Sequence, residues 1–323
     1  MSLSEFSIIE RYFRRSPTQA DNVVLGIGDD AALIAPPAGE LLAISVDTLI
    51  AGRHFPEQTT PADIGYKSLA VNLSDMAAMG ATPRWITLSL ALPEVDEDFL
   101  SGFSEQLLAL AKQHDVQLIG GDTVRGPLAI TLQILGTVPA EGAPKRSGAS
   151  VGDLIFVSGT LGDAAAGLAT ILAGETASGD GRYLIERLNR PSPRVNLGLA
   201  LRGVASAAID LSDGLLADLG HILEQSGVGA VVDSKKIPCS DELLRTVVDQ
   251  QQRVALMVAG GDDYELCFTV SPSRADVINQ ISTDLSLPLV QIGRIGEGSE
   301  LLLDGERISP KGFDHFKGKA HGS

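Results

Sequence analysis

One stretch of this chain has no periodic pattern and divides it into two parts. Residues 139–153, PAEGAPKRSGASVGD, combine glycine, proline and a short basic pair, a composition typical of a linker. On both sides of it, strand-like apolar runs such as 41–47 alternate with helix-like patterns such as 61–79. Because 323 residues suit two domains of ordinary size, we predict domains at 1–140 and 150–323, each of mixed α/β fold.

The helix expected at 61–79 has the clearest boundaries. Thr60 is suited to cap its start, Pro61 to occupy its first turn and Asp63 to complete a capping box, while Gly80 is suited to end it. A second helix is expected at 96–114. Further strands are predicted at 85–92, 116–121, 128–138, 154–159, 207–212, 229–233, 264–270 and 288–295.

The charge of the chain limits its partners. A formal charge of −16 makes the surface acidic, and an acidic surface repels the phosphates of nucleic acids. No apolar run reaches the length of about 18 residues that spans a bilayer. The first residues also lack the pattern of a secretion signal. We therefore expect a cytoplasmic protein with no nucleic-acid or membrane partner, in which Cys239 and Cys267 are reduced core residues.

Aspartate beside glycine or a small polar residue recurs where strand patterns end. The motifs are GIGDD (26–30), SVDT (45–48), GGDT (120–123) and DLSDG (210–214). In α/β proteins the ends of strands are where ligands bind. Carboxylate oxygens without histidine or thiolate neighbours favour hard cations such as magnesium. Any one of these motifs is also what an ordinary turn contains, and it is their repetition that favours a site.

The motif GIGDDA also fits a loose dinucleotide-binding pattern, because it follows a short apolar run. In that pattern the loop presents backbone N–H groups to a pyrophosphate, and Asp29 and Asp30 would place negative charge in the same position. The chain contains neither a G-x-x-x-x-G-K-[ST] loop nor a protein-kinase signature. If ATP binds, it must be held largely through metal ions.

A set of blocks in fixed order gives a more specific indication. They are EFSIIERYF, GIGDDAA, SVDTLIAGRHF, AVNLSDMAAMGATP, GGDT, RSGA, AIDLSDGL, GGDDYEL and GFDHF. Together they resemble the thiamine monophosphate kinase family, in the superfamily that also contains aminoimidazole ribonucleotide synthetase and selenophosphate synthetase. The resemblance implies a two-domain synthetase-like α/β fold that forms homodimers through its N-terminal domains. It also implies an active site in the cleft between domains, with several Mg²⁺ ions, ATP as co-substrate and thiamine monophosphate as acceptor.

The resemblance also assigns roles position by position. The metal-binding set falls on Asp30, Ser45, Asp47, Asp75, Asp122, Asp210 and Asp213, with the backbone of Val46 as a further contributor. Nucleotide contacts fall on Gly121, Asp122, Arg146 and Ser212, and His114 stands where a nucleotide-contacting tyrosine is common. Contacts to thiamine phosphate fall on His54, Asp262 and Phe313.

Some of these positions have a second interpretation. Asp262 replaces the usual glutamate and is one methylene shorter, while Phe313 replaces a frequent tryptophan or tyrosine. Phe313 is also compatible with core packing, His54 with a surface loop and Arg146 with a linker charge. The expected reaction is direct transfer of the γ-phosphoryl group of ATP to thiamine monophosphate. Three alternatives remain: a synthetase of the same superfamily, a dinucleotide-dependent oxidoreductase, and a non-catalytic nucleotide- or ion-binding protein.

Overall fold

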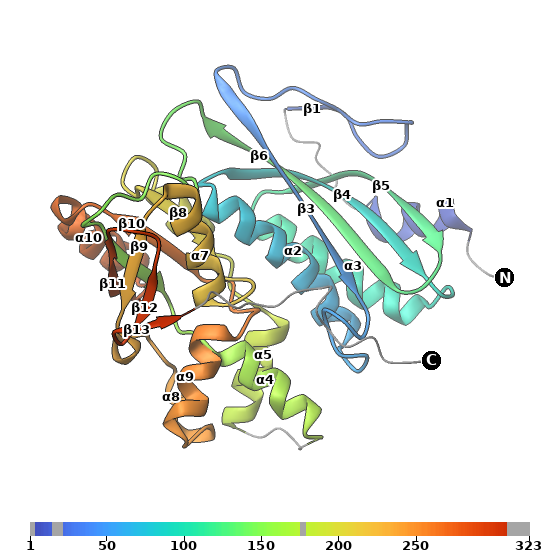
Figure 1. Cartoon of the computed structure of the whole chain (residues 1–323). Helices are drawn as coiled ribbons and strands as arrows, with labels where there is room; N and C mark the ends of the chain where they lie inside the picture. Colours follow the sequence, from blue (N-terminus) through green and yellow to red (C-terminus); the bar gives the residue numbers. More distant parts are fainter. Residues whose placement is uncertain (1–3, 15–21, 175–178, 309–323) are drawn as a thin grey trace. The chain divides into compact units, whose positions relative to one another are not determined.

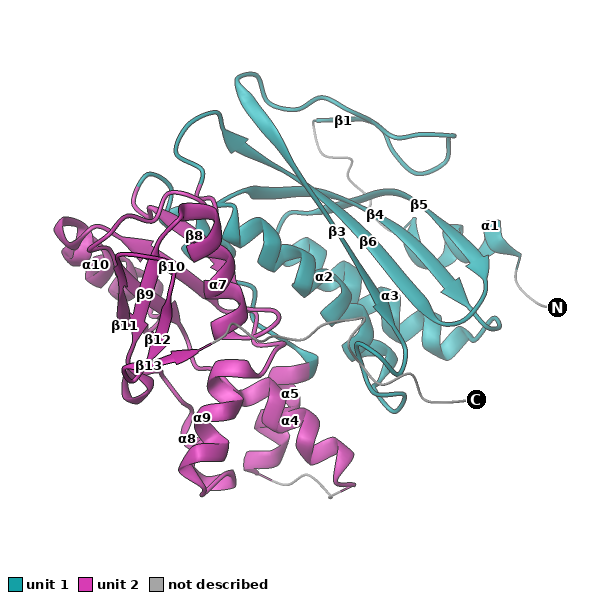
Figure 2. Ribbon diagram, viewed as in Figure 1, with its two compact units in different colours: residues 1–143, 189–203 teal, residues 144–188, 204–323 magenta. Residues whose placement is uncertain are grey.

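The chain folds into two compact units. The computed structural model describes residues 4–14, 22–174 and 179–308 (Figure 1). Unit 1 consists of residues 1–143 and 189–203, and unit 2 of residues 144–188 and 204–323 (Figure 2). The first crossing between units falls in the stretch predicted to be a linker. The chain then returns to unit 1 at 189–203, a feature that the predicted scheme of two continuous domains did not include.

Unit 1 is built on one main sheet. Among its described residues, four strands pair in the order β3, β6, β4, β5. Their bounds are β3 (Glu40–Ile50), β4 (Thr82–Leu92), β5 (Gln117–Arg125) and β6 (Ala129–Pro139). β6 pairs antiparallel with β3 and β4, whereas β4 and β5 run parallel. β3 and β5 are therefore the two edges of this sheet.

Helices α2 (Pro61–Ala78) and α3 (Glu97–Gln113) cover one face of the sheet (Figure 1). The predicted start of α2 is confirmed, because the Thr60 Oγ1 accepts the Asp63 N–H at 3.1 Å and donates to the Asp63 carboxylate at 2.8 Å. The two helices approach closely: a Cβ on Gly65 would overlap the Phe103 carbonyl. This contact explains why α2 has glycine within its second turn despite the cost in helix propensity.

The opposite face of the sheet is only partly covered. The short strands β1 (Val23–Leu25) and β2 (Leu33–Ile34) form a hairpin, and Val23 packs there with Trp85 and Ile119. Along β3 the side chains that alternate onto this face stay exposed. They are Leu42, Ile44, Val46, Thr48 and Ile50, with exposed fractions of 58% for Ile44 and 56% for Val46. Unit 1 thus carries an apolar open face along β3.

The N-terminal segment packs against α3. It consists of α1 (Glu5–Ile8), capped by the Ser4 hydroxyl, and the π-helical turn η1 (Ile9–Phe13). Phe13 is buried and meets Phe103 edge to face, with 6.5 Å between ring centroids. The other side of this segment forms a wall of the pocket described below.

The returning segment 189–203 is fixed to α2 by packing and hydrogen bonds. It contains α6 (Val195–Ala200), and a Cβ on Gly198 would overlap the Ala77 carbonyl. The Arg202 guanidinium donates to the Gly80 carbonyl at 2.5 Å and to the Thr82 hydroxyl at 3.0 Å. The segment therefore secures the C-terminal end of α2, which carries Asp75.

We expect Gly198→Ala to destabilise unit 1 by about 3 kcal/mol, because the added methyl has no space between α6 and the α2 backbone. Gly126→Ala is a matched control, since its Cβ would meet only Ala91 at an ordinary 3.6 Å. Urea unfolding of both variants measures the difference. Equal midpoints for the two variants would contradict the close approach of α6 to α2.

Unit 2 is built on a larger mixed sheet. Of its described residues, seven strands pair in the order β13, β12, β9, β11, β7, β10, β8. They are β7 (Leu154–Ser158), β8 (Ala207–Asp210), β9 (Gly229–Val232), β10 (Leu266–Val270), β11 (Leu289–Gly296), β12 (Leu301–Leu303) and β13 (Glu306–Ile308). Only β9 and β12 run parallel among these pairs. The predicted mixed α/β fold is confirmed.

The helices of unit 2 follow the strands in sequence. Their bounds are α4 (Asp163–Leu172), α5 (Asp180–Asn189), α7 (Leu215–Ser226), α8 (Asp241–Thr246), α9 (Gln250–Ala259) and α10 (Ala275–Leu285). Two single 3₁₀ turns, η2 (Ser234–Lys236) and η3 (Pro272–Arg274), complete the unit. Among all described helices, none has both the length and the apolar composition to cross a bilayer.

Candidate active site

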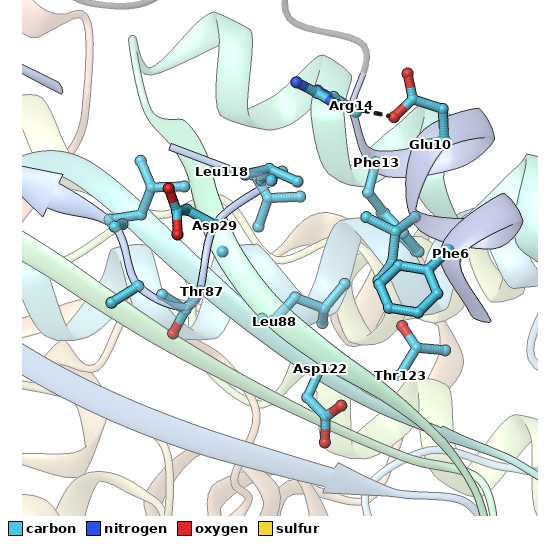
Figure 3. Close-up of a pocket in the computed structure, with 18 of the residues that line it drawn as sticks. Phe6, Glu10, Phe13, Arg14, Asp29, Thr87, Leu88, Leu118, Asp122 and Thr123 are labelled. Carbon is cyan, nitrogen blue, oxygen red and sulfur yellow. Dashed lines mark hydrogen bonds and ion pairs between the residues drawn. The ribbon is translucent and has the colours of Figure 1, made fainter. Parts of the chain in front are cut away.

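A pocket of about 780 Å³ lies at the β5 edge of the unit 1 sheet (Figure 3). One wall comes from the N-terminal segment and mixes the aromatic Phe6 and Phe13 with the charged Glu5, Glu10 and Arg14. The rest is formed by the loop from Ile27 to Ala32, by Thr87 and Leu88 of β4 and by residues 118–123 of β5. Of the sequence-predicted residues, Asp30, Gly121 and Asp122 line this pocket. Its mixed polar and apolar lining suits a ligand with an apolar ring and a charged end.

The loop that carries Asp30 is not a dinucleotide-binding turn. Asp29 and Asp30 lie between β1 and β2, and the carboxylate of Asp29 accepts the Asp30 N–H at 2.9 Å. The next element is strand β2, whereas dinucleotide binding requires a helix whose N-terminus faces the pyrophosphate. The oxidoreductase alternative therefore has no structural support.

Gly121 brings the β5 backbone to the wall of the pocket. Its φ is +152°, and a Cβ at this position would overlap the Leu88 carbonyl of the neighbouring strand β4. Asp122 follows at once, with an exposed carboxylate beside Thr123 (Figure 3). Glycine is thus required here by the strand pairing, and it leaves the backbone of residues 120–122 open to a ligand.

A second group of predicted residues lies at the β3 edge of the same sheet. The Ser45 hydroxyl donates to the Asp75 carboxylate at 2.5 Å, which ties β3 to α2. Asp47 is two residues from Ser45 and shares its helix-covered face by strand alternation, whereas Val46 points to the open face. At the end of β3 the His54 Nδ1 accepts the Ile50 N–H at 2.9 Å. The buried Lys67 ammonium donates to the His54 carbonyl at 3.4 Å.

These two groups in unit 1 are on opposite edges of the sheet. Three strand spacings separate β3 from β5, a distance of about 14 Å. Across the described residues, no three histidine, cysteine, aspartate or glutamate side chains gather closely enough to hold a metal ion. Within unit 1, the acids at the β5 edge and those at the β3 edge do not form one cluster.

In unit 2 the motif DLSDG forms a tight turn between β8 and α7. Asp210 ends β8 and is buried, while Ser212 and Asp213 follow in the turn. The Asp218 carboxylate on α7 accepts the N–H groups of Ser212, Asp213 and Gly214, at 3.0, 3.1 and 3.1 Å. Asp218 therefore fixes the turn that carries both Ser212 and Asp213.

Negative charge accumulates around this turn. Burial, and then the charges of Asp210 and Asp213, raise the pKa of Asp218 to about 7, although hydrogen bonds from the backbone oppose the shift. An oxygen-only group of acids whose charges disfavour one another suits a divalent cation, which would offset that repulsion. The carboxylate oxygens around this turn are thus of the kind that magnesium prefers.

The motif GGDDYEL lies beside the DLSDG turn in unit 2. The Asp262 N–H donates to the Ser212 carbonyl at 2.9 Å, and the Tyr264 N–H donates to the Leu211 carbonyl at 2.8 Å. A Cβ on Gly261 would overlap the Ser212 carbonyl, so the two loops touch through their backbones. These backbone contacts place Asp262 beside Ser212 and Asp213. The predicted strand 264–270 begins too early, because β10 starts at Leu266 and Tyr264 and Glu265 precede it.

The remaining predicted residues fall in different places. Arg146 is exposed in a loop of unit 2 that joins β8 through the hydrogen bond from the Ala208 N–H to the Lys145 carbonyl, 2.9 Å long. His114 caps the end of α3, where burial lowers its pKa against the opposing charge of Asp115. It does not line the pocket that holds Gly121. Phe313 lies outside the described residues.

Two buried charged residues, Asp218 and Lys67, belong to no motif that the sequence patterns singled out. Asp218 is an acid within the apolar face of α7, between the buried Leu215 and Ile222. Lys67 lies in the same way within the buried part of α2 and is 2% exposed. A charged residue at an apolar position of a helical pattern is the signal that identifies both, since such residues are rarely buried without a partner.

Comparison with known proteins gives matches over nearly the whole chain. Residues 28–138 match the family model "AIR synthase related protein, N-terminal domain", and residues 150–304 match the model of its C-terminal domain. The chain is 51% identical to the thiamine-monophosphate kinase of Salmonella typhimurium, over 98% of this chain and 99% of the relative. It is 36% identical to that of Bacillus subtilis, over 98% of this chain and all of the relative.

Solved structures of thiamine-monophosphate kinases also match this chain over nearly its whole length. The thiamine-monophosphate kinase of Stenotrophomonas maltophilia K279a superposes with a TM-score of 0.89 at 49% identity, covering 95% of this chain and 99% of that one. AaThiL complexed with AMPPCP and TMP superposes with a TM-score of 0.80 at 30% identity, covering 97% of both chains. The hydrogenase maturation protein HypE in complex with ATP shares the fold at a TM-score of 0.76, with 20% identity over 97% of this chain and 95% of that one.

Proposed function

This chain belongs to the thiamine-monophosphate kinase family, and from that premise we infer that it transfers the γ-phosphoryl group of ATP to thiamine monophosphate, giving thiamine diphosphate and ADP. Identity of 51% over nearly the full length of a curated relative carries this conclusion. The relative that was solved with AMPPCP and TMP has the same fold over 97% of this chain. The protein is thus an ATP-dependent kinase of thiamine biosynthesis.

We assign magnesium to the oxygen ligands of both units. The metal-binding residues proposed are Asp30, Ser45, Asp47, Asp75, Asp122, Asp210 and Asp213, with the Val46 backbone. The tight turn that carries Asp210 and Asp213 supports a cation there, because the Asp218 carboxylate holds the backbone of residues 212–214 and keeps the two acids close in sequence on one turn. Bound magnesium would supply charge neutralisation for the two phosphates and for the leaving ADP.

The acceptor needs no general base. A phosphate monoester has its second pKa near 6, so the attacking oxygen already carries negative charge at neutral pH. The aspartates therefore serve to bind and orient, not to remove a proton. Contacts to the acceptor are proposed for His54, Asp262 and Phe313, and contacts to ATP for Gly121, Asp122, Arg146, Ser212 and His114. We place the reaction in the cytoplasm, which agrees with the two free cysteines.

We further propose that two copies pair through the open face of the unit 1 sheet. Exposed apolar side chains such as Ile44 and Val46 provide the buried core that such an interface needs. If the twofold axis runs along the strands, pairing would also place the β5 edge of one protomer opposite the β3 edge of its partner. Asp122 is on β5, whereas Ser45 and its partner Asp75 of α2 are at the β3 edge, so each edge carries only part of the proposed ligand set, and this separation supports the arrangement.

Ile44→Glu is expected to convert the dimer to a monomer, because each protomer would bury an unpaired carboxylate in the interface. Sedimentation equilibrium measures the change in mass. Val248→Glu is the matched control, since Val248 is 83% exposed on unit 2 and outside the proposed interface. A dimer that survives Ile44→Glu would exclude this face.

The activity itself is tested by ADP release with magnesium, ATP and thiamine monophosphate, and with each component omitted in turn. Release that depends on the acceptor, with thiamine diphosphate identified by mass, is the expected result. Release without acceptor, or a product other than thiamine diphosphate, would instead indicate another ATP-using enzyme of the same superfamily. ATP binding without any ADP release would indicate a non-catalytic nucleotide-binding protein.

A further inference from the structure

Unit 2 contains a buried group of charged side chains that no proposed role yet explains. Its members are Asp163, Arg187, Asp263 and Glu265. The Arg187 guanidinium contacts the Glu265 Oε1 at 3.0 Å and the Asp163 Oδ2 at 3.7 Å. Asp163 and Glu265 are fully buried and the Arg187 side chain is only 12% exposed. Two acids thus pair with one arginine away from water, and the buried Asp263 lies within reach of its charge.

Asp263 and Glu265 alternate in sequence with Asp262 and Tyr264, whose backbone conformations are strained. Asp262 has a φ of +67° and Tyr264 a φ of +50°, both in the left-handed region that residues other than glycine rarely adopt. Asp263 lies between them and Glu265 follows. Two such residues this close persist only where the surrounding contacts determine the backbone completely.

Asp263 and Glu265 supply those contacts on the buried side of the loop. The Asp263 Oδ2 accepts the Gly162 N–H at 2.8 Å, and the Glu265 Oε2 accepts the Ser158 hydroxyl at 2.6 Å. A Cβ on Gly159, whose φ is +58°, would overlap the Glu265 carboxylate. Both acids are therefore held by the turn between β7 and α4.

On its other side the loop is held by the DLSDG turn. Besides the bonds from the N–H groups of Asp262 and Tyr264, the Leu211 N–H donates to the Glu265 carbonyl at 2.8 Å. The side chains of Asp263 and Glu265 thus fix one side of the backbone, while residues 211 and 212 fix the other. A shift of Asp263 would move Asp262 directly.

The arrangement is not one that stability alone would select. The Asp263 Oδ1 has no hydrogen-bond partner among the described residues, and burial raises the pKa of this carboxyl well above its usual value. Replacement of buried ionic groups by apolar residues is often neutral or stabilising. Buried groups that cost stability, such as this carboxyl, are expected where function requires a particular geometry.

We propose that Asp263 and Glu265, both held by the turn at 158–163 and Glu265 also by Arg187, are positioning residues that fix Asp262 for binding of the phosphorylated acceptor. This inference rests on the proposed function for the identity of the acceptor and on the proposed role of Asp262. Asp263 and Glu265 do not touch the substrate. They act through the backbone of the loop that presents Asp262.

Asp263→Ala and Asp263→Asn test the inference together. Alanine removes the acceptor for the Gly162 N–H, whereas asparagine keeps an oxygen in the same place. For Asp263→Ala we expect a rise of about tenfold or more in the KM for thiamine monophosphate, with the KM for ATP and kcat changed by less than about threefold. Asp263→Asn should restore a KM close to that of the unchanged protein.

Amide hydrogen exchange of the peptide 259–266 gives a second measurement that does not depend on turnover. Exchange should be faster in Asp263→Ala and unchanged in Asp263→Asn, because the loop is free to leave the left-handed conformation only in the first. Asp180→Ala, which breaks the exposed pair with Arg245 in the same unit, is the control and should change neither measurement.

Three results would overturn the inference: an unchanged KM for thiamine monophosphate in Asp263→Ala, a parallel rise in both KM values, or an Asp263→Asn variant as impaired as the alanine. Failure of the proposed function would look different. In that case the unchanged protein would show no acceptor-dependent ADP release, while the exchange comparison would still decide whether Asp263 fixes the loop.

Discussion

Asp75→Asn is expected to lower kcat by about a thousandfold while shifting the melting temperature by no more than about 3 °C. Asp75 lies on α2 and accepts the Ser45 hydroxyl at 2.5 Å. Asparagine keeps an oxygen acceptor for that hydroxyl and nearly the same volume, so packing is preserved. It removes the negative charge that the proposed binding of magnesium at this edge requires.

The matched control is Asp115→Asn, which makes the same chemical change at an exposed position of unit 1. Asp115 has a φ of +54°, a conformation that asparagine adopts readily, so activity and stability should both be retained. Steady-state kinetics and thermal unfolding of the two variants give the comparison. If Asp75→Asn lost its stability and retained its turnover, Asp75 would be a structural residue.

The second large effect is expected from a mixture of two inactive variants. Asp75→Asn damages the β3 edge and Asp122→Asn damages the β5 edge, and each should be nearly inactive alone. If each site combines the β3 edge of one protomer with the β5 edge of its partner, a mixed dimer contains one intact site. Random pairing makes half of the dimers mixed, so activity should return to about a quarter of the unchanged level.

Co-expression of the two variants with different affinity tags allows the mixed dimer to be isolated and assayed. No recovery in a purified mixed dimer would mean that each site is built from one chain only. Combining Asp75→Asn with Asp47→Asn is the control, because both residues belong to the β3 edge and their mixed dimer should stay inactive.

Much of the fold could be predicted because it depends on local patterns. The start of α2 at Pro61 follows from Thr60 and Asp63, whose side chains form the cap that the residue types indicate. The strands 129–139 and 207–210 follow from apolar runs bounded by turns. The ordered blocks that carry the family resemblance are equally local, which is why the reaction could be predicted from the residues alone.

What the sequence could not provide depends on long-range order. Nothing local indicates that β3 and β5 are opposite edges, because strand order arises from the pairing of β6 with both β3 and β4. The roles of Asp218 and Arg187 are hidden for a similar reason. Asp218 contacts backbone N–H groups, which almost any residue type provides, and Arg187 contacts Glu265, which is distant in sequence. Neither residue therefore belongs to a recognisable motif.

The return of residues 189–203 to unit 1 has a consequence for the order of synthesis. A ribosome releases all four strands of the first sheet, and then the opening strand and helices of unit 2, before α6 appears. During translation the surface of α2 that Gly198 contacts therefore stays uncovered until α6 has been synthesised. The earlier half of this protein is completed only after the later half has begun to form.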